Sequence, residues 1–158
     1  MTDPATVVAL LRERDQTVAT AESLTAGLVT AALTSVPGAS AAVRGGLVVY
    51  ATDLKHALAG VDEALLAEHG AVHPEVARQL AEGARTRCGA DWGLGLTGVA
   101  GPDPQDGVGP GTVHIGLSNG AGTEVRSMTL GGDRHEVRSR SVDAALALLL
   151  EGLTSTSG

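Results

Sequence analysis

The sequence predicts an α/β domain of three layers, α/β/α, in which a mixed, mostly parallel sheet lies between helices. Short apolar runs alternate along the chain with segments of helical periodicity, a pattern that favours parallel strands covered on both faces. Two later runs, 112–117 and 124–130, flank a turn-rich linker and predict a C-terminal antiparallel hairpin. The length of 158 residues suits one domain over 1–153, followed by a disordered polar tail at 154–158.

Turn and cap residues mark the elements of the first half. Asp3-Pro4 begins a helix, because proline is favoured at the first helical position. A strand follows at 17–21, and the turn at 23–25 opens a second helix. A strand at 46–50 comes next, and 61–70 predicts a short helix that ends at a glycine.

The second half continues the alternation and contains one long loop. A helix begins at Pro74, and its apolar residues recur at four-residue steps up to Cys88, which is therefore expected to be a small buried hydrophobe. A strand at 93–97 leads into a loop at 98–110 that is long enough to suggest a function. An Asp-x-x-Glu capping box at 133–136 opens the last helix.

The composition excludes several classes of protein. The net charge is −7 with both signs scattered, and only 1% of residues are aromatic, so no nucleic-acid partner is expected. One cysteine permits no intrachain disulfide, and the five histidines lack zinc-type spacing, so neither a metal nor a cofactor is expected. No stretch resembles a membrane span or a signal peptide, so we expect a cytoplasmic protein without a membrane partner.

Three predicted strands lead into hydroxyl-bearing residues that would meet at one edge of the sheet. Ser23 follows the first strand, Tyr50 ends the second with Lys55 shortly after, and Thr97 ends the third. Ligands of open α/β sheets bind outside the carboxyl ends of the strands. A serine near a lysine favours acyl-transfer chemistry. The structural alternatives are a helix cap for Ser23 or Thr25, a solvated lysine at a helix start, and a tyrosine in water.

Glycines and arginines extend the candidate site. Gly98 and Gly101 follow the third strand and permit a close approach to a ligand, although they also suit a tight turn. The segment is not a Walker loop, because Gly-Lys-Ser/Thr is missing. Arg134 and Arg138 are one helical turn apart and could either clamp a phosphate or remain solvated.

Several motifs, in order along the chain, resemble the CinA C-terminal domain family. They are Ala-Glu-Ser-Leu-Thr-Ala-Gly at 21–27, Ser-Val-Pro-Gly-Ala-Ser at 35–40, Tyr50 with Lys55, Thr-Gly-Val-Ala-Gly-Pro at 97–102, Gly-Thr-Val at 111–113 and Gly-Asp-Arg at 132–134. The resemblance implies an α/β/α amidohydrolase that converts nicotinamide mononucleotide to nicotinic acid mononucleotide and ammonia, in pyridine nucleotide salvage within NAD metabolism. It also implies a homo-oligomer, with a dimer expected.

The resemblance also implies roles for individual residues. Ser23 would be the nucleophile, Lys55 its base, and Tyr50 a residue that orients or assists proton transfer. The substrate would be bound by residues of the glycine-containing turns and of the last helix: Thr25, Gly27, Thr97, Gly98, Gly101, and Arg134 or Arg138.

The chain departs from the family pattern at two places near this site. Ala26 stands where the family has the first glycine of Thr-Gly-Gly, and 103–106 (Asp-Pro-Gln-Asp) replaces a glycine-rich run. Three other functions stay open. They are a catalytically silent nucleotide-binding module, an interaction module linked to competence or DNA damage, and hydrolysis of a different amide or phosphoester.

Overall fold

The centre of the protein is a five-stranded sheet with the strand order β2-β1-β3-β4-β5. The structure, a computed structural model, describes residues 1–155. Its strands are β1 (Val18–Glu22), β2 (Val43–Val48), β3 (Trp92–Gly98), β4 (Thr112–Ser118) and β5 (Thr123–Thr129). The pairs β1–β2 and β1–β3 are parallel, whereas β3–β4 and β4–β5 are antiparallel. The predicted mixed sheet with its C-terminal hairpin is confirmed.

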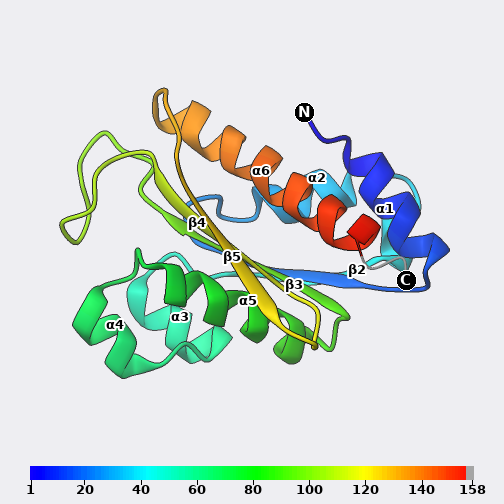
Figure 1. Cartoon of the computed structure of the whole chain (residues 1–158), viewed down its shortest axis with the longest axis horizontal. Coiled ribbons are helices and arrows are strands. Elements are labelled where there is room, and N and C mark those ends of the chain that lie inside the picture. The colour runs from blue at the N-terminus through cyan, green and yellow to red at the C-terminus, as the bar shows by residue number, and fades with distance from the viewer. Residues whose placement is uncertain (156–158) are drawn as a thin grey trace.

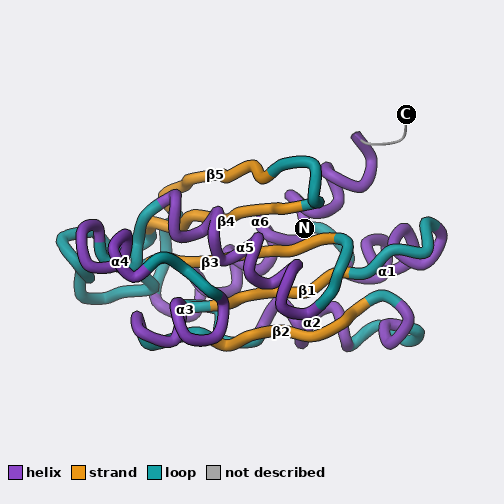
Figure 2. Tube along the Cα trace, turned by 90° about the horizontal axis from the view of Figure 1, so that it is seen from below, coloured by secondary structure: helices purple, strands orange, loops and turns teal. Residues whose placement is uncertain are grey.

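Helices cover both faces of the sheet and complete the predicted three layers (Figure 1). One face carries α1 (Pro4–Glu13), α2 (Leu28–Thr34) and α6 (Arg134–Ser155), and a short 3-10 helix (Ala39–Ala41) follows α2. The other carries α3 (Thr52–Ala59), α4 (Glu63–His69) and α5 (Pro74–Cys88). Figure 2 looks onto the sheet from this second side and shows the strands in order from β5 to β2. Each helical layer encloses an apolar cluster, and Cys88 packs partly buried against the one under α5.

Glycines let α5 approach the sheet closely. A Cβ added to Gly93 would lie 2.0 Å from the carbonyl oxygen of Ala81, and one added to Gly116 would lie 2.5 Å from that of Ala77. The backbone of α5 therefore packs where larger side chains would hold it away, and a core almost free of aromatic residues suffices.

The parallel pairing brings the ends of β1, β2 and β3 to one edge of the sheet. Glu22, the last residue of β1, is opposite Val48 of β2 and Leu96 of β3. The residues that follow these three strands are therefore neighbours, as the sequence predicted.

The turn after β1 differs from the prediction, because α2 begins at Leu28 and not at 23–25. The buried carboxylate of Glu22 accepts hydrogen bonds from the backbone N–H groups of Val29 (2.9 Å) and Thr30 (3.0 Å). These N–H groups belong to the first turn of α2 and would otherwise be unpaired. The predicted helix start at 23–25 is therefore wrong.

Two further differences bear on the site and on the C-terminal end. β2 spans Val43–Val48 and not 46–50, because its pairing with β1 begins at Val43. Tyr50 thus lies two residues beyond the strand. α6 includes residues 154 and 155, which the sequence placed in the polar tail, and residues 156–158 lie outside the described part of the chain.

Candidate active site

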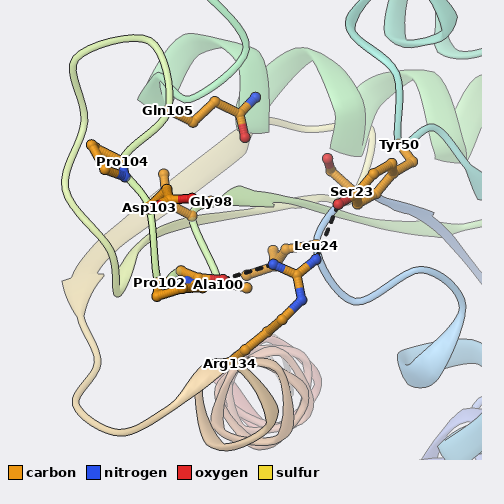
Figure 3. Close-up of a pocket in the computed structure, with 12 residues that line it drawn as sticks. Ser23, Leu24, Tyr50, Gly98, Ala100, Pro102, Asp103, Pro104, Gln105 and Arg134 are labelled. Atoms are coloured by element: carbon orange, nitrogen blue, oxygen red, sulfur yellow. Dashed lines mark hydrogen bonds between the residues drawn. The ribbon is translucent and has the colours of Figure 1, made fainter.

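A cavity of about 320 Å³ opens at the edge of the sheet where β1, β2 and β3 end. Its lining comes from the turn after β1, the end of β2, the loop after β3 and the start of α6: Ser23, Leu24, Tyr50, Gly98, Val99, Ala100, Gly101, Pro102, Asp103, Pro104, Gln105 and Arg134. In Figure 3 the loop that carries 102–105 lies on one side, Ser23 and Tyr50 lie on the other, and Arg134 reaches between them from α6. Four predicted site residues besides Ser23, namely Tyr50, Gly98, Gly101 and Arg134, thus share one cavity.

The Ser23 hydroxyl borders this cavity. The backbone N–H of Ser23 donates to the carbonyl oxygen of Leu96 (3.0 Å), which fixes the residue against β3. Within residues 1–155 its hydroxyl makes no hydrogen bond, and neither does the backbone N–H of Leu24. The turn continues through Ala26 at φ 47°, a left-handed conformation that favours glycine. Ser23 is not the cap of α2, so its hydroxyl is available to a ligand.

Lys55 is the only lysine in the sequence, and its side chain is just 1% exposed. Its Nζ donates to the carbonyl oxygens of Val49 (2.9 Å) and Tyr50 (3.1 Å), so the amine lies directly behind the end of β2. Burial lowers the pKa of Lys55 from 10.5 to about 8, partly opposed by the negative charge of Asp106. The amine neither lines the cavity nor hydrogen-bonds to Ser23 in the described residues. With this pKa the amine can nevertheless act as a base near neutral pH, and it lies beside this edge of the sheet.

The two arginines of α6 make different contacts. Arg134 donates through Nη1 to the carbonyl oxygen of Gly101 (2.8 Å) and through Nη2 to the hydroxyl of Tyr50 (3.1 Å), as the dashed lines in Figure 3 show. Arg138 donates through Nε to the carbonyl oxygen of Leu24 (2.8 Å). Arg134 therefore bridges two sides of the cavity, whereas Arg138 supports the turn that carries Ser23.

Three predicted ligand residues do not line the cavity. The Thr97 hydroxyl is buried and donates to the carbonyl oxygen of Ala71 (2.7 Å). Gly27, at φ 98°, is the N-cap of α2. The Thr25 hydroxyl is fully buried, and in the described part of the chain it has no hydrogen-bond partner. All three shape the turns around the site.

Two acidic residues near the site were not assigned a role from the sequence. Glu22 fixes the start of α2, next to Ser23. Asp106 belongs to the loop after β3 and acts on the pKa of Lys55. Asp106-Gly107 is the dipeptide that favours a tight hairpin turn, so the sequence did contain a signal for this position.

Comparison with protein families identifies the chain. The family model for the CinA C-terminal domain matches residues 2–153. The chain belongs to this family. It is 51% identical over 153 residues to a CinA-like protein of Frankia casuarinae, covering 95% of this chain and 35% of that protein. It is 49% identical over 149 residues to a CinA-like protein of Anaeromyxobacter sp. (strain Fw109-5), covering 92% of this chain and 36% of that one. The chain thus spans about a third of the length of these curated relatives.

Solved structures of family members have the same fold. A CinA superfamily protein from Klebsiella pneumoniae 700603 superimposes with a TM-score of 0.92 at 31% identity, over 96% of each chain. The competence/damage inducible protein CihA from Agrobacterium tumefaciens gives 0.90 at 33% identity, over 98% of this chain and 97% of that one. Within residues 1–155, no helix is long and apolar enough to cross a bilayer.

Proposed function

We propose that this CinA-family domain hydrolyses the carboxamide of nicotinamide mononucleotide to nicotinic acid mononucleotide and ammonia. One observation carries the proposal: a serine hydroxyl without a hydrogen bond in the described residues borders a cavity at the strand ends, and a buried lysine behind the end of the neighbouring strand β2 has its pKa lowered to about 8. A hydroxyl nucleophile with a lysine base is a known arrangement for acyl transfer. We place the reaction in the cytoplasm, in pyridine nucleotide salvage.

In this mechanism the Ser23 Oγ attacks the carboxamide carbon, and its proton passes to the neutral amine of Lys55. The backbone N–H of Leu24 stabilises the oxyanion, since Leu24 lines the cavity and this N–H has no partner within residues 1–155. The C–N bond then breaks, and the proton held by Lys55 leaves with ammonia. Water next attacks the Ser23 ester, with Lys55 again as base. The ester C–O bond then breaks, Lys55 returns the proton to Ser23 Oγ, and nicotinic acid mononucleotide leaves as its carboxylate.

The position of Lys55 adds a requirement to this mechanism. Its amine is hydrogen-bonded to two carbonyl oxygens and not to Ser23. Proton transfer therefore requires a bridging water, or rotation of the amine away from one of these partners. Tyr50, whose carbonyl oxygen binds Lys55 and whose hydroxyl borders the cavity, would orient this transfer.

Arg134 is the residue that we assign to the substrate phosphate. Its guanidinium lines the cavity, and the protein as a whole carries a net charge of −7, so attraction of an anion depends on local positive charge. The contacts of Arg138 favour a supporting role for that residue.

The direct test is incubation with nicotinamide mononucleotide, followed by measurement of ammonia and of nicotinic acid mononucleotide. We expect equal amounts of both products from the wild type and neither from Ser23→Ala. A folded wild-type protein that releases no ammonia above the Ser23→Ala background would contradict the proposed activity.

A second candidate function is nucleotide binding without catalysis, favoured by the absence of a direct Ser23–Lys55 hydrogen bond in the described residues. It predicts that calorimetry detects binding of the mononucleotide while no ammonia is released.

A further inference from the structure

Asp106 lies at the tip of the loop that forms one wall of the cavity. Gln105 and Val108 exchange two backbone hydrogen bonds, of 3.0 and 2.8 Å, and so close a two-residue hairpin turn. The turn residues Asp106 and Gly107 have φ values of 51° and 77°. Asp-Gly is a preferred pair for such a turn, because both residues tolerate positive φ. The local sequence thus fixes where the Asp106 carboxylate is presented.

This carboxylate holds the loop on the segment between α4 and α5. Asp106 Oδ2 accepts a hydrogen bond from the backbone N–H of Ala71 (3.2 Å). The side chain packs so closely over Gly70 that a Cβ added there would lie 2.8 Å from Oδ2. The carbonyl oxygen of the same Ala71 accepts the hydrogen bond of Thr97 at the end of β3. One peptide segment therefore ties the loop tip to the strand from which the loop departs.

Asp106 also acts on Lys55 through its charge. Desolvation disfavours the ammonium form of Lys55, and the Asp106 carboxylate is the charged group that opposes this effect. Its counterpart in the same loop, Asp103, lines the cavity but has no such influence.

We propose that Asp106 is a positioning residue: its carboxylate docks the cavity loop on Ala71, and from this docked position it supplies the negative charge of the region around Lys55. This role concerns the site of the proposed amidohydrolase, so the activity measurement described below rests on that proposed function. The docking contact and the charge belong to one side chain, so the closed loop and the protonation state of Lys55 are coupled.

Other ionisable groups lie near Lys55 or near Ala71 in the chain, and a test must distinguish their effects from the effect of Asp106. They are Tyr50, Asp53 and His56 beside Lys55 in the chain, and His69 and His73 on either side of the docking segment. The rings of His69 and His73 stack with centroids 4.4 Å apart.

The experiment uses the single lysine as a probe. Protein labelled with [¹³C]lysine gives one Cε signal from Lys55, whose chemical shift reports its titration. We compare the wild type with Asp106→Asn, which keeps an acceptor and a turn-favouring Asn-Gly pair but removes the charge. Mass spectrometry checks that the new Asn-Gly pair has not deamidated. Asp103→Asn is the matched control.

We expect the titration midpoint of Lys55 to move to lower pH in Asp106→Asn and to stay unchanged in Asp103→Asn. Hydrogen exchange of the Ala71 amide reports docking. We expect protection in Asp106→Asn close to that of the wild type, and at least about tenfold faster exchange in Asp106→Ala, which lacks the acceptor. An unmoved midpoint in Asp106→Asn, or unchanged Ala71 exchange in Asp106→Ala, would each overturn the proposal.

Removal of the Asp106 charge should increase the rate of hydrolysis and not reduce it. Removing the charge leaves more of Lys55 neutral at pH 7, so Asp106→Asn should hydrolyse the mononucleotide about two- to threefold faster, with the acid limb of its pH profile at lower pH. If the wild type releases no ammonia, the proposed activity fails, while the NMR arms still decide the role of Asp106. If the midpoint moves but the acid limb does not, Lys55 is not the base.

Discussion

Lys55→Met should stabilise the protein at neutral pH while it abolishes activity. The ammonium of Lys55 is buried, and its pKa falls from 10.5 to about 8 on folding. A shift of that size corresponds to a penalty of about 3 kcal/mol for the charged form in the folded state. Removing the amine relieves this penalty but leaves the carbonyl oxygens of Val49 and Tyr50 without their donor, at about 1 kcal/mol each. The net gain at pH 7 is about 1 kcal/mol.

The sign of the effect reverses with pH, which makes this prediction specific. Below about pH 8 both the folded and the unfolded protein hold the proton, so the wild type carries the full penalty. Between pH 8 and 10.5 the unfolded chain keeps a proton that the folded protein has released, so wild-type stability rises with pH. Above this window the penalty is gone, and only the lost hydrogen bonds distinguish the variant. Lys55→Met should then be the less stable protein.

The assay is urea denaturation of both proteins at pH 7 and at pH 10.5. Lys55→Gln is the control, because it removes the charge but keeps an N–H donor, and it should be at least as stable as Lys55→Met at both pH values. A Lys55→Met protein that is less stable than the wild type at pH 7, by a margin that does not grow at pH 10.5, would refute the reasoning.

The remaining predictions concern the reaction and the turn around the nucleophile. Ser23→Ala should abolish ammonia release and change the free energy of unfolding by less than about 0.5 kcal/mol, because the hydroxyl has no hydrogen bond to lose among the described residues; a stable, active variant would exclude the nucleophile. Lys55→Arg should be nearly inactive at every pH, since arginine stays protonated, and a normal rate would show that only charge matters. Arg134→Ala should weaken binding of the mononucleotide about ten- to a hundredfold by calorimetry, whereas Arg138→Ala should mainly lower stability; equal affinities would reject the phosphate clamp. When inactive Ser23→Ala subunits are mixed with binding-impaired Arg134→Ala subunits of the expected homodimer, activity should be regained only if the site is shared between subunits. Ala26→Gly should raise stability by up to about 1 kcal/mol in denaturation experiments, because φ there is 47°, and a loss would mean that the methyl group contributes packing.

Periodicity and strand ends were enough to predict the layers of the fold and one edge of the sheet as the candidate site. Ser23, Tyr50 and Arg134 meet there because parallel strands end together, a rule that depends on topology and not on side-chain detail. Family resemblance, and not spacing, assigned roles to Ser23 and Lys55, and those roles remain proposals.

The sequence could not predict which polar side chains are used by the fold itself. The Thr97 hydroxyl, predicted to bind the substrate, is hydrogen-bonded to Ala71, and the Glu22 carboxylate, which was given no role, holds the start of α2. Both contacts join residues whose proximity depends on tertiary packing. The docking of Asp106 on Ala71 is likewise a contact between residues 35 positions apart. Only the turn that carries Asp106 is indicated by the sequence, through the Asp-Gly pair.

The solitary, buried lysine also gives the protein a selective chemical reactivity. At pH 7 roughly one in ten copies of Lys55 has a neutral, nucleophilic amine, whereas an exposed lysine is neutral in fewer than about one in a thousand. The sequence contains no other lysine to compete for an acylating reagent. Because this amine lies behind the end of β2, molecular size and not basicity limits which reagents reach it. A small acylating probe and a bulky one with the same reactive group should therefore label Lys55 to very different extents, whereas both can reach the exposed α-amino group of Met1.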